Sequence, residues 1–67
     1  MISYEPFFNT LKKKHITQYQ LINQYHVSAG QLSRMRANAH ISTHTIDMLC
    51  NILDCQVDEI LCFYKSN

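Results

Sequence analysis

The sequence predicts an all-α domain of five short helices, and three observations support this fold class. The chain has 67 residues, a length that fits one small domain rather than several. It contains one Gly and one Pro, far below average usage, which disfavours a turn-rich β-sandwich or barrel. Its apolar residues recur at three- and four-residue spacing, as in amphipathic helices. We therefore expect residues 1–67 to form a single helical domain.

The first helix is predicted over residues 3–14. Ser3 is a candidate cap, and Pro6 lies early enough to be tolerated in a first turn. The residues that share its apolar face are Phe7, Phe8 and Leu11. The run Lys12 to Lys14 then places three cations in the last turn, where they suit the helix dipole.

A capping box predicts the start of the second helix, which we expect over residues 17–25. Thr17 is the cap, and Gln20 follows three residues later, at the spacing that such a box requires. Leu21 and Tyr25 continue the apolar stripe at helical spacing.

The third helix is predicted over residues 28–37, with Ser28 as its cap and Leu32 and Met35 as its apolar stripe. The link to the preceding helix is so short that the two helices cannot lie antiparallel side by side. They must cross steeply, which is the geometry of a helix-turn-helix.

Two further helices are predicted in the C-terminal part of the chain. Ser42 caps a helix whose apolar positions fall at offsets 0, 3, 4 and 7, namely Ile46, Leu49, Cys50 and Leu53. After a short connector, residues 57–64 are predicted to form a fifth helix, with Asp58 and Glu59 in its first turn.

The formal net charge of +1 conceals an uneven distribution along the chain. Residues 10–45 contain five Lys and Arg, no carboxylate and all four histidines, whereas residues 46–67 carry a net charge of −3. A basic segment of this kind favours a polyanionic partner, although a solvated face explains many such runs equally well.

The order of these elements resembles the DNA-binding domain of the lambda-Cro and phage-repressor type, the Xre family. The matching segments are the run Thr17 to Ile22, the turn ending in Val27 and Ser28, the stripe of Leu32 and Met35, the cap and stripe from Ser42 to Leu53, and the connector Leu53 to Val57. The resemblance implies a lambda-repressor-like helix-turn-helix domain in which the helix at residues 28–37 is the recognition helix.

Two positions depart from the pattern of that family. His26 stands where the turn usually has Gly, so a non-glycine residue is expected to adopt a left-handed conformation there. Ile22 stands where the second helix usually presents a small residue to the recognition helix, and we expect it to separate or rotate the two helices slightly.

The resemblance also implies which residues contact DNA, because the major groove admits an α-helix that a second helix braces against the backbone. The residues that carry over as base contacts are Ala29, Gly30, Gln31, Ser33 and Arg34. Those that carry over, or lie well placed, as phosphate contacts are Thr17, Gln18, Ser28, Arg36, Asn38, His40 and Thr43.

The leading hypothesis is a transcriptional regulator, a repressor, that binds specific sequences of double-stranded DNA as a homodimer. A single recognition helix contacts only a few base pairs, and the segment Leu61 to Tyr64 is the candidate dimer surface. The alternative is a helix-turn-helix protein-interaction module, an adaptor or antirepressor, without specific DNA binding. Ala29 and Gly30 favour it because their side chains offer no hydrogen bonds to bases.

Other classes of function are excluded by the residues present. No nucleophile, base and orienting group stand at a plausible spacing, so we expect no catalytic residues, no cofactor and no small-molecule substrate. Cys50 and Cys55 lie at apolar positions and His40 and His44 lie on either side of a cap, so we expect no metal site. No apolar run approaches the roughly 18–20 residues that a membrane span needs, and we expect a cytoplasmic protein without a membrane partner.

Overall fold

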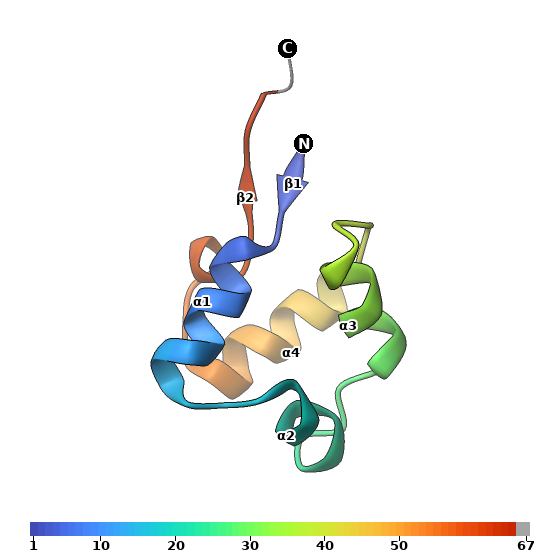
Figure 1. Cartoon of the computed structure of the whole chain (residues 1–67), viewed down its shortest axis with the longest axis vertical. Helices are drawn as coiled ribbons and strands as arrows, with labels where there is room; N and C mark the ends of the chain where they lie inside the picture. Colours follow the sequence, from blue (N-terminus) through green and yellow to red (C-terminus); the bar gives the residue numbers. More distant parts are fainter. Residues whose placement is uncertain (66–67) are drawn as a thin grey trace.

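The computed structural model describes residues 1–65, which form a mostly helical fold of the predicted class (Figure 1). The elements in chain order are β1 (Ile2–Ser3), α1 (Glu5–Lys14), α2 (Gln18–Asn23), α3 (Ala29–Arg36), α4 (Thr43–Leu53), the 3-10 turn η1 (Val57–Glu59) and β2 (Cys62–Phe63). Over these residues no helix has the length and apolar character needed to cross a membrane.

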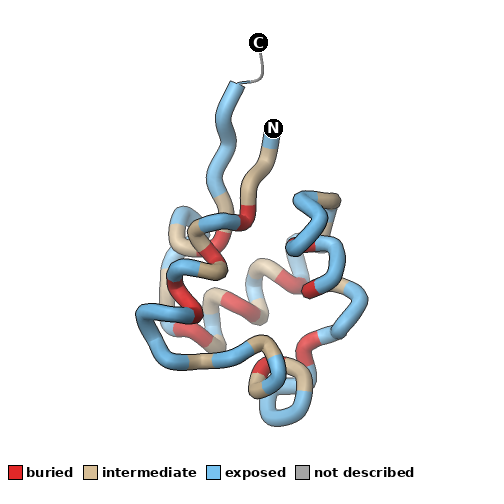
Figure 2. The backbone as a smooth tube through the Cα atoms, in the orientation of Figure 1, coloured by how far each residue is buried: buried red, intermediate tan, exposed pale blue. Residues whose placement is uncertain are grey.

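The core lies where α1, α3 and α4 face one another, and buried residues line the inner side of each of these helices (Figure 2). Its buried apolar side chains are Tyr4, Phe7, Leu11, Leu21, Val27, Leu32, Met35, Leu49, Leu53 and Ile60. They include every position of the predicted stripe of α3 and two of the four positions predicted for α4, whereas Ile46 and Cys50 are half-buried.

Three of the four α-helices begin at the predicted caps. The side chains of Thr17, Ser28 and Ser42 each accept a hydrogen bond from the backbone N–H three residues later. At α1 the cap is Tyr4 rather than Ser3, because Ser3 belongs to β1. The Ser3 hydroxyl nevertheless accepts a hydrogen bond from the first backbone N–H of α1, on Glu5, at 3.2 Å.

The predicted fifth helix over residues 57–64 is wrong. Only Val57–Glu59 form a helical turn, and Cys62–Phe63 pair instead with Ile2–Ser3 in an antiparallel sheet, in the register Ile2 to Phe63 and Ser3 to Cys62. Pairing with the N-terminal strand satisfies backbone groups that an isolated short helix would satisfy only marginally. The two paired strands, β1 and β2, are called the hairpin below, although they lie at opposite ends of the chain. They project away from the helices (Figure 1).

Left-handed backbone conformations close several helix ends without glycine. His26 has φ 59°, as predicted from the missing glycine of the turn. Among residues 1–65, the other non-glycine residues with positive φ are His15, Asn38 and Asp54, and each stands just after a helix. Gly30 has no positive φ, so the one glycine of the chain is not used for chain reversal.

Tyr4 ties the N-terminal segment to the loop between α3 and α4. Its side chain is 3% exposed, and its hydroxyl donates a hydrogen bond to the carbonyl oxygen of Ala39 at 2.7 Å. Its backbone N–H donates to Oδ1 of Asn38 at 3.3 Å. A residue outside the helix-turn-helix therefore holds the loop that follows the predicted recognition helix.

We expect Tyr4→Phe to lower the free energy of unfolding by about 0.5–1.5 kcal/mol, the net value of one hydrogen bond, because the buried ring is retained. Urea denaturation followed by circular dichroism measures the change. Tyr19→Phe is the matched control, because Tyr19 is 74% exposed and removal of its hydroxyl breaks no buried hydrogen bond. Equal losses in the two variants would contradict the role assigned to the Tyr4 hydroxyl.

The thiol of Cys55 gives the fold a specific dependence on alkaline pH. Burial, together with the neighbouring Cys50 and Glu59, raises the pKa of Cys55 from 9.0 to about 11. The folded state therefore favours the neutral thiol, whereas the unfolded chain releases the proton near pH 9. The resulting stabilisation is complete below pH 9 and is lost as the pH rises from about 9 to about 11.

We accordingly expect the free energy of unfolding of the wild-type chain to fall more steeply between about pH 9 and pH 11 than that of Cys55→Ala. Denaturation under reducing conditions at several pH values measures both slopes. Parallel slopes for the two proteins would show that Cys55 does not couple folding to pH.

Candidate nucleic-acid interface

Local hydrogen bonds fix both the start of α2 and the turn that leads from α2 to α3. At the start of α2, the backbone N–H of Thr17 donates to the side-chain oxygen of Gln20 at 2.8 Å, and the N–H of Gln20 donates back to the Thr17 hydroxyl at 3.1 Å. After α2, the left-handed His26 reverses the chain and the N–H of Val27 donates to the carbonyl of Leu21 at 2.9 Å. Val27 and Leu21 are both buried, so the turn is anchored in the core.

The third helix, α3, presents one face to the core and the other to solvent. Leu32 and Met35 are fully buried. Of the predicted base-contact residues, the ones that lie exposed are Ala29, Gly30, Ser33 and Arg34. The structure therefore places four of these five residues together on the solvent side of one helix.

Gln31, the fifth predicted base contact, differs from its neighbours. It is half-buried, and its side-chain oxygen accepts hydrogen bonds from the backbone N–H of Ser42 at 3.2 Å and from the hydroxyl of Thr45 at 3.0 Å. These bonds join α3 to the first turn of α4.

The predicted phosphate contacts come from segments that precede and follow α3 in the chain. Near the start of α2, Thr17 is exposed and Gln18 is half-buried. Beyond the end of α3, His40 and Thr43 are exposed in the loop and at the start of α4. In the chain, the α2–α3 turn leads into α3 and the α3–α4 loop leaves it (Figure 1).

Several of the predicted phosphate contacts already have partners within the protein. The guanidinium of Arg36 donates a hydrogen bond through Nη1 to the side-chain oxygen of Gln18, which links the end of α3 to the start of α2. The hydroxyl of Ser28 caps α3, and Oδ1 of Asn38 accepts from Tyr4. Each of these side chains is still exposed or half-exposed, but its position is set by the fold.

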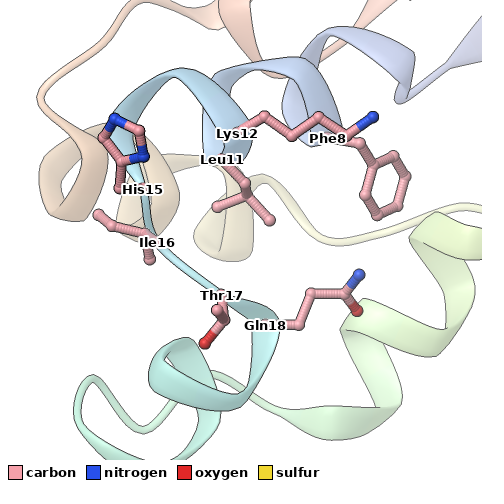
Figure 3. A pocket seen from close by; sticks show the side chains of 7 residues that line it. All are labelled: Phe8, Leu11, Lys12, His15, Ile16, Thr17 and Gln18. Atoms are coloured by element: carbon pink, nitrogen blue, oxygen red, sulfur yellow. The ribbon is translucent and has the colours of Figure 1, made fainter.

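A groove of about 420 Å³ lies between the end of α1 and the start of α2 (Figure 3). Its lining residues are Phe8, Leu11, Lys12, His15, Ile16, Thr17 and Gln18. Lys12, an exposed lysine of the last turn of α1, therefore lines the same groove as Thr17 and Gln18, two predicted phosphate contacts at the start of α2. The acidic residues lie elsewhere, mainly on α4 and η1.

The structure offers no set of metal ligands within residues 1–65, where no group of three or more His, Cys, Asp or Glu side chains is arranged to hold an ion. Cys50 and Cys55 are half-buried free thiols packed against the core, and Cys62 is an exposed free thiol.

Tyr19 is an exposed residue of α2 that was not among the predicted DNA contacts. It stands at the second position of α2 and is 74% exposed. Its offset of two residues from the buried Leu21 corresponds to about 200° around the helix, which is the signal that places it on the outer face.

The capped α2, the fixed turn and the exposed face of α3 together define a helix-turn-helix DNA-binding domain. A comparison with protein-family models supports this assignment over most of the chain. The chain belongs to the family of Cro/C1-type HTH DNA-binding domains, whose model matches residues 9–66.

A solved structure shares the fold. It is the crystal structure of the transcriptional regulator VanUg in its form II, with a TM-score of 0.81 and 20% sequence identity, covering 90% of this chain and 80% of the other. No match was found among curated protein sequences.

Proposed function

We propose that this chain is a transcriptional repressor that binds a specific sequence of double-stranded DNA as a homodimer. The observation that carries the proposal is the exposed face of α3, with Ser33 and Arg34 on a helix whose inner face is buried in the core and whose end is hydrogen-bonded to α2. Membership of a DNA-binding family and a fold shared with a transcriptional regulator support it.

Base reading is assigned mainly to Arg34 and Ser33. An Arg side chain makes bidentate hydrogen bonds to guanine in the major groove, and a Ser hydroxyl bonds to several bases. Ala29 and Gly30 contribute close approach and, for Ala29, an apolar contact with the thymine methyl group. Thr17, Gln18, Ser28, Arg36, Asn38, His40 and Thr43 are assigned to the phosphate backbone, with Arg36 and Gln18 acting as a hydrogen-bonded pair.

The homodimer is assigned to the hairpin of β1 and β2. Phe63 is 67% exposed and Met1 57%, and Phe63 stands opposite the neighbouring Ile2 in the two-stranded sheet. An isolated two-stranded sheet is marginally stable, and each of its edge strands has unpaired backbone groups. Pairing with the same two strands of a second copy of the chain would add strands to the sheet and satisfy these groups. Leu61 packs against the core and therefore lies outside the proposed dimer surface, whereas Cys62 and Tyr64 are exposed and belong to it.

We expect Arg34→Ala to lower affinity for the selected DNA site about 5- to 150-fold, corresponding to about 1–3 kcal/mol, and to relax the preference for one base pair. Selection of duplexes from a pool with a randomised centre, followed by fluorescence anisotropy, measures both effects. Lys65→Ala removes the same charge from the exposed C-terminal segment and is the matched control.

If Arg34→Ala and Lys65→Ala weakened binding equally and left base preference unchanged, Arg34 would not be a base reader. If the wild-type chain enriched no sequence from the pool, a protein-interaction module would replace the proposed regulator.

We expect the wild-type chain to sediment with a mass near twice 7.9 kDa and Phe63→Glu to sediment as a monomer, because a buried carboxylate would oppose hairpin pairing. Val57→Glu is the control, since Val57 is 51% exposed on η1. Circular dichroism confirms that both variants are folded. A monomeric wild type, with and without DNA, would overturn the dimer.

A further inference from the structure

The start of α4 is capped by side chains from two different helices. The hydroxyl of Ser42 accepts from the backbone N–H of Thr45 at 3.1 Å, as the first half of a capping box requires. In the second half, a long side chain three residues after the cap returns to the backbone N–H of the cap. Thr45 occupies that position, and its side chain is too short to do so.

Gln31 of α3 supplies the missing half of this box. Its side-chain oxygen accepts from the N–H of Ser42 at 3.2 Å and from the hydroxyl of Thr45 at 3.0 Å. A backbone N–H can only donate, so the atom that faces Ser42 must be the amide oxygen and not the amide nitrogen. By contrast, α2 completes its own box with Thr17 and Gln20.

These two hydrogen bonds constrain α3 in a way that its apolar contacts do not. Burial of Leu32 and Met35 holds α3 against the core, but apolar contacts are non-directional and permit a small roll of the helix about its axis. Hydrogen bonds weaken steeply when their geometry is lost. A roll of α3 would therefore break both bonds of Gln31 and leave the hydroxyl of Thr45, which is 6% exposed, with one partner fewer.

The same bonds limit what Gln31 can do on DNA. A Gln side chain reads adenine with both atoms of its amide, because the oxygen accepts from the base amino group while the nitrogen donates to the ring. In this structure the oxygen already accepts two hydrogen bonds. Bidentate reading of adenine would require Gln31 to release at least one of its α4 partners.

We propose that Gln31 is a positioning residue that sets the rotation of the recognition helix through the first turn of α4, and that it does not read a base. This inference rests on the proposed DNA-binding function of α3. It revises the expectation from the family resemblance that Gln31 contacts a base edge.

The test compares Gln31→Met, Thr45→Val and the double variant on the DNA site selected by the wild-type chain. Thr45 is buried and its hydroxyl donates a hydrogen bond to Gln31 of α3, so an effect of Thr45→Val on DNA binding reports positioning. We expect each single variant to lower affinity about 2- to 10-fold and the double variant to lower it no further than the larger single loss. All measurements are made where circular dichroism shows the proteins folded.

Base preference separates positioning from direct reading. If Gln31 positions the helix, Gln31→Met and Thr45→Val select the same sequence as the wild type, whereas Ser33→Ala, two residues further along α3 and on its exposed face, changes it. A Gln31→Met variant that loses preference for one base pair while Thr45→Val retains it would overturn the proposal. So would unchanged affinity in both single variants.

A second measurement does not depend on DNA binding at all. Hydrogen exchange of the Ser42 amide should accelerate in Gln31→Met and be restored in Gln31→Glu, which keeps an acceptor oxygen at the same reach. If the wild-type chain selects no DNA sequence but this pattern holds, the proposed function fails while the contact between α3 and α4 stands. An unchanged Ser42 exchange rate in Gln31→Met would refute the positioning role directly.

Discussion

The first turn of α4 is the point on which the rest of the interface depends. The backbone N–H of its cap, Ser42, donates a hydrogen bond to Gln31 of α3. The loop that leads to Ser42 is hydrogen-bonded to Tyr4 at the start of α1. Three segments that are distant in the sequence are thus joined by directional bonds near one end of a core helix. In a chain with so few buried polar groups, these bonds determine the orientation that the apolar core leaves free.

This arrangement divides the polar side chains of the helix-turn-helix into two groups. One group makes hydrogen bonds within the protein and fixes geometry, as Thr17, Ser28 and Gln31 do. The other group, which includes Ser33 and Arg34, projects from α3 into solvent. A residue of the first group can touch a phosphate with its remaining donors, but it has less freedom to discriminate between bases, since its orientation serves the fold.

Local sequence signals predicted the features that depend on local physics. Caps act over three residues, so Thr17, Ser28 and Ser42 were recognisable, and the left-handed turn at His26 followed from the absence of glycine. Features that join distant segments were not predictable in this way. The acidic first turn of residues 57–64 favoured a helix, but pairing of β2 with β1, some sixty residues away, decided the outcome.

The same distinction applies to the site. The exposure of Ser33 and Arg34 follows from the helical period of Leu32 and Met35. The commitment of Gln31 does not, because its partners lie 11 and 14 residues further along the chain and no periodic pattern connects them. The family resemblance places Gln31 on α3. Only the structure shows that its amide oxygen accepts hydrogen bonds from Ser42 and Thr45.

The hairpin also governs the order in which the fold can form. Pairing Ile2 with Phe63 closes a loop that contains almost the whole domain, whereas each helix needs only neighbouring residues. Closing this loop costs chain entropy before the contact between the two strands contributes any stability. The hydrogen bonds between β1 and β2 should therefore form after the helices have assembled. By the same reasoning it should be the first part to open, so fraying at either strand exposes the opposite strand as well while the helix-turn-helix stays intact.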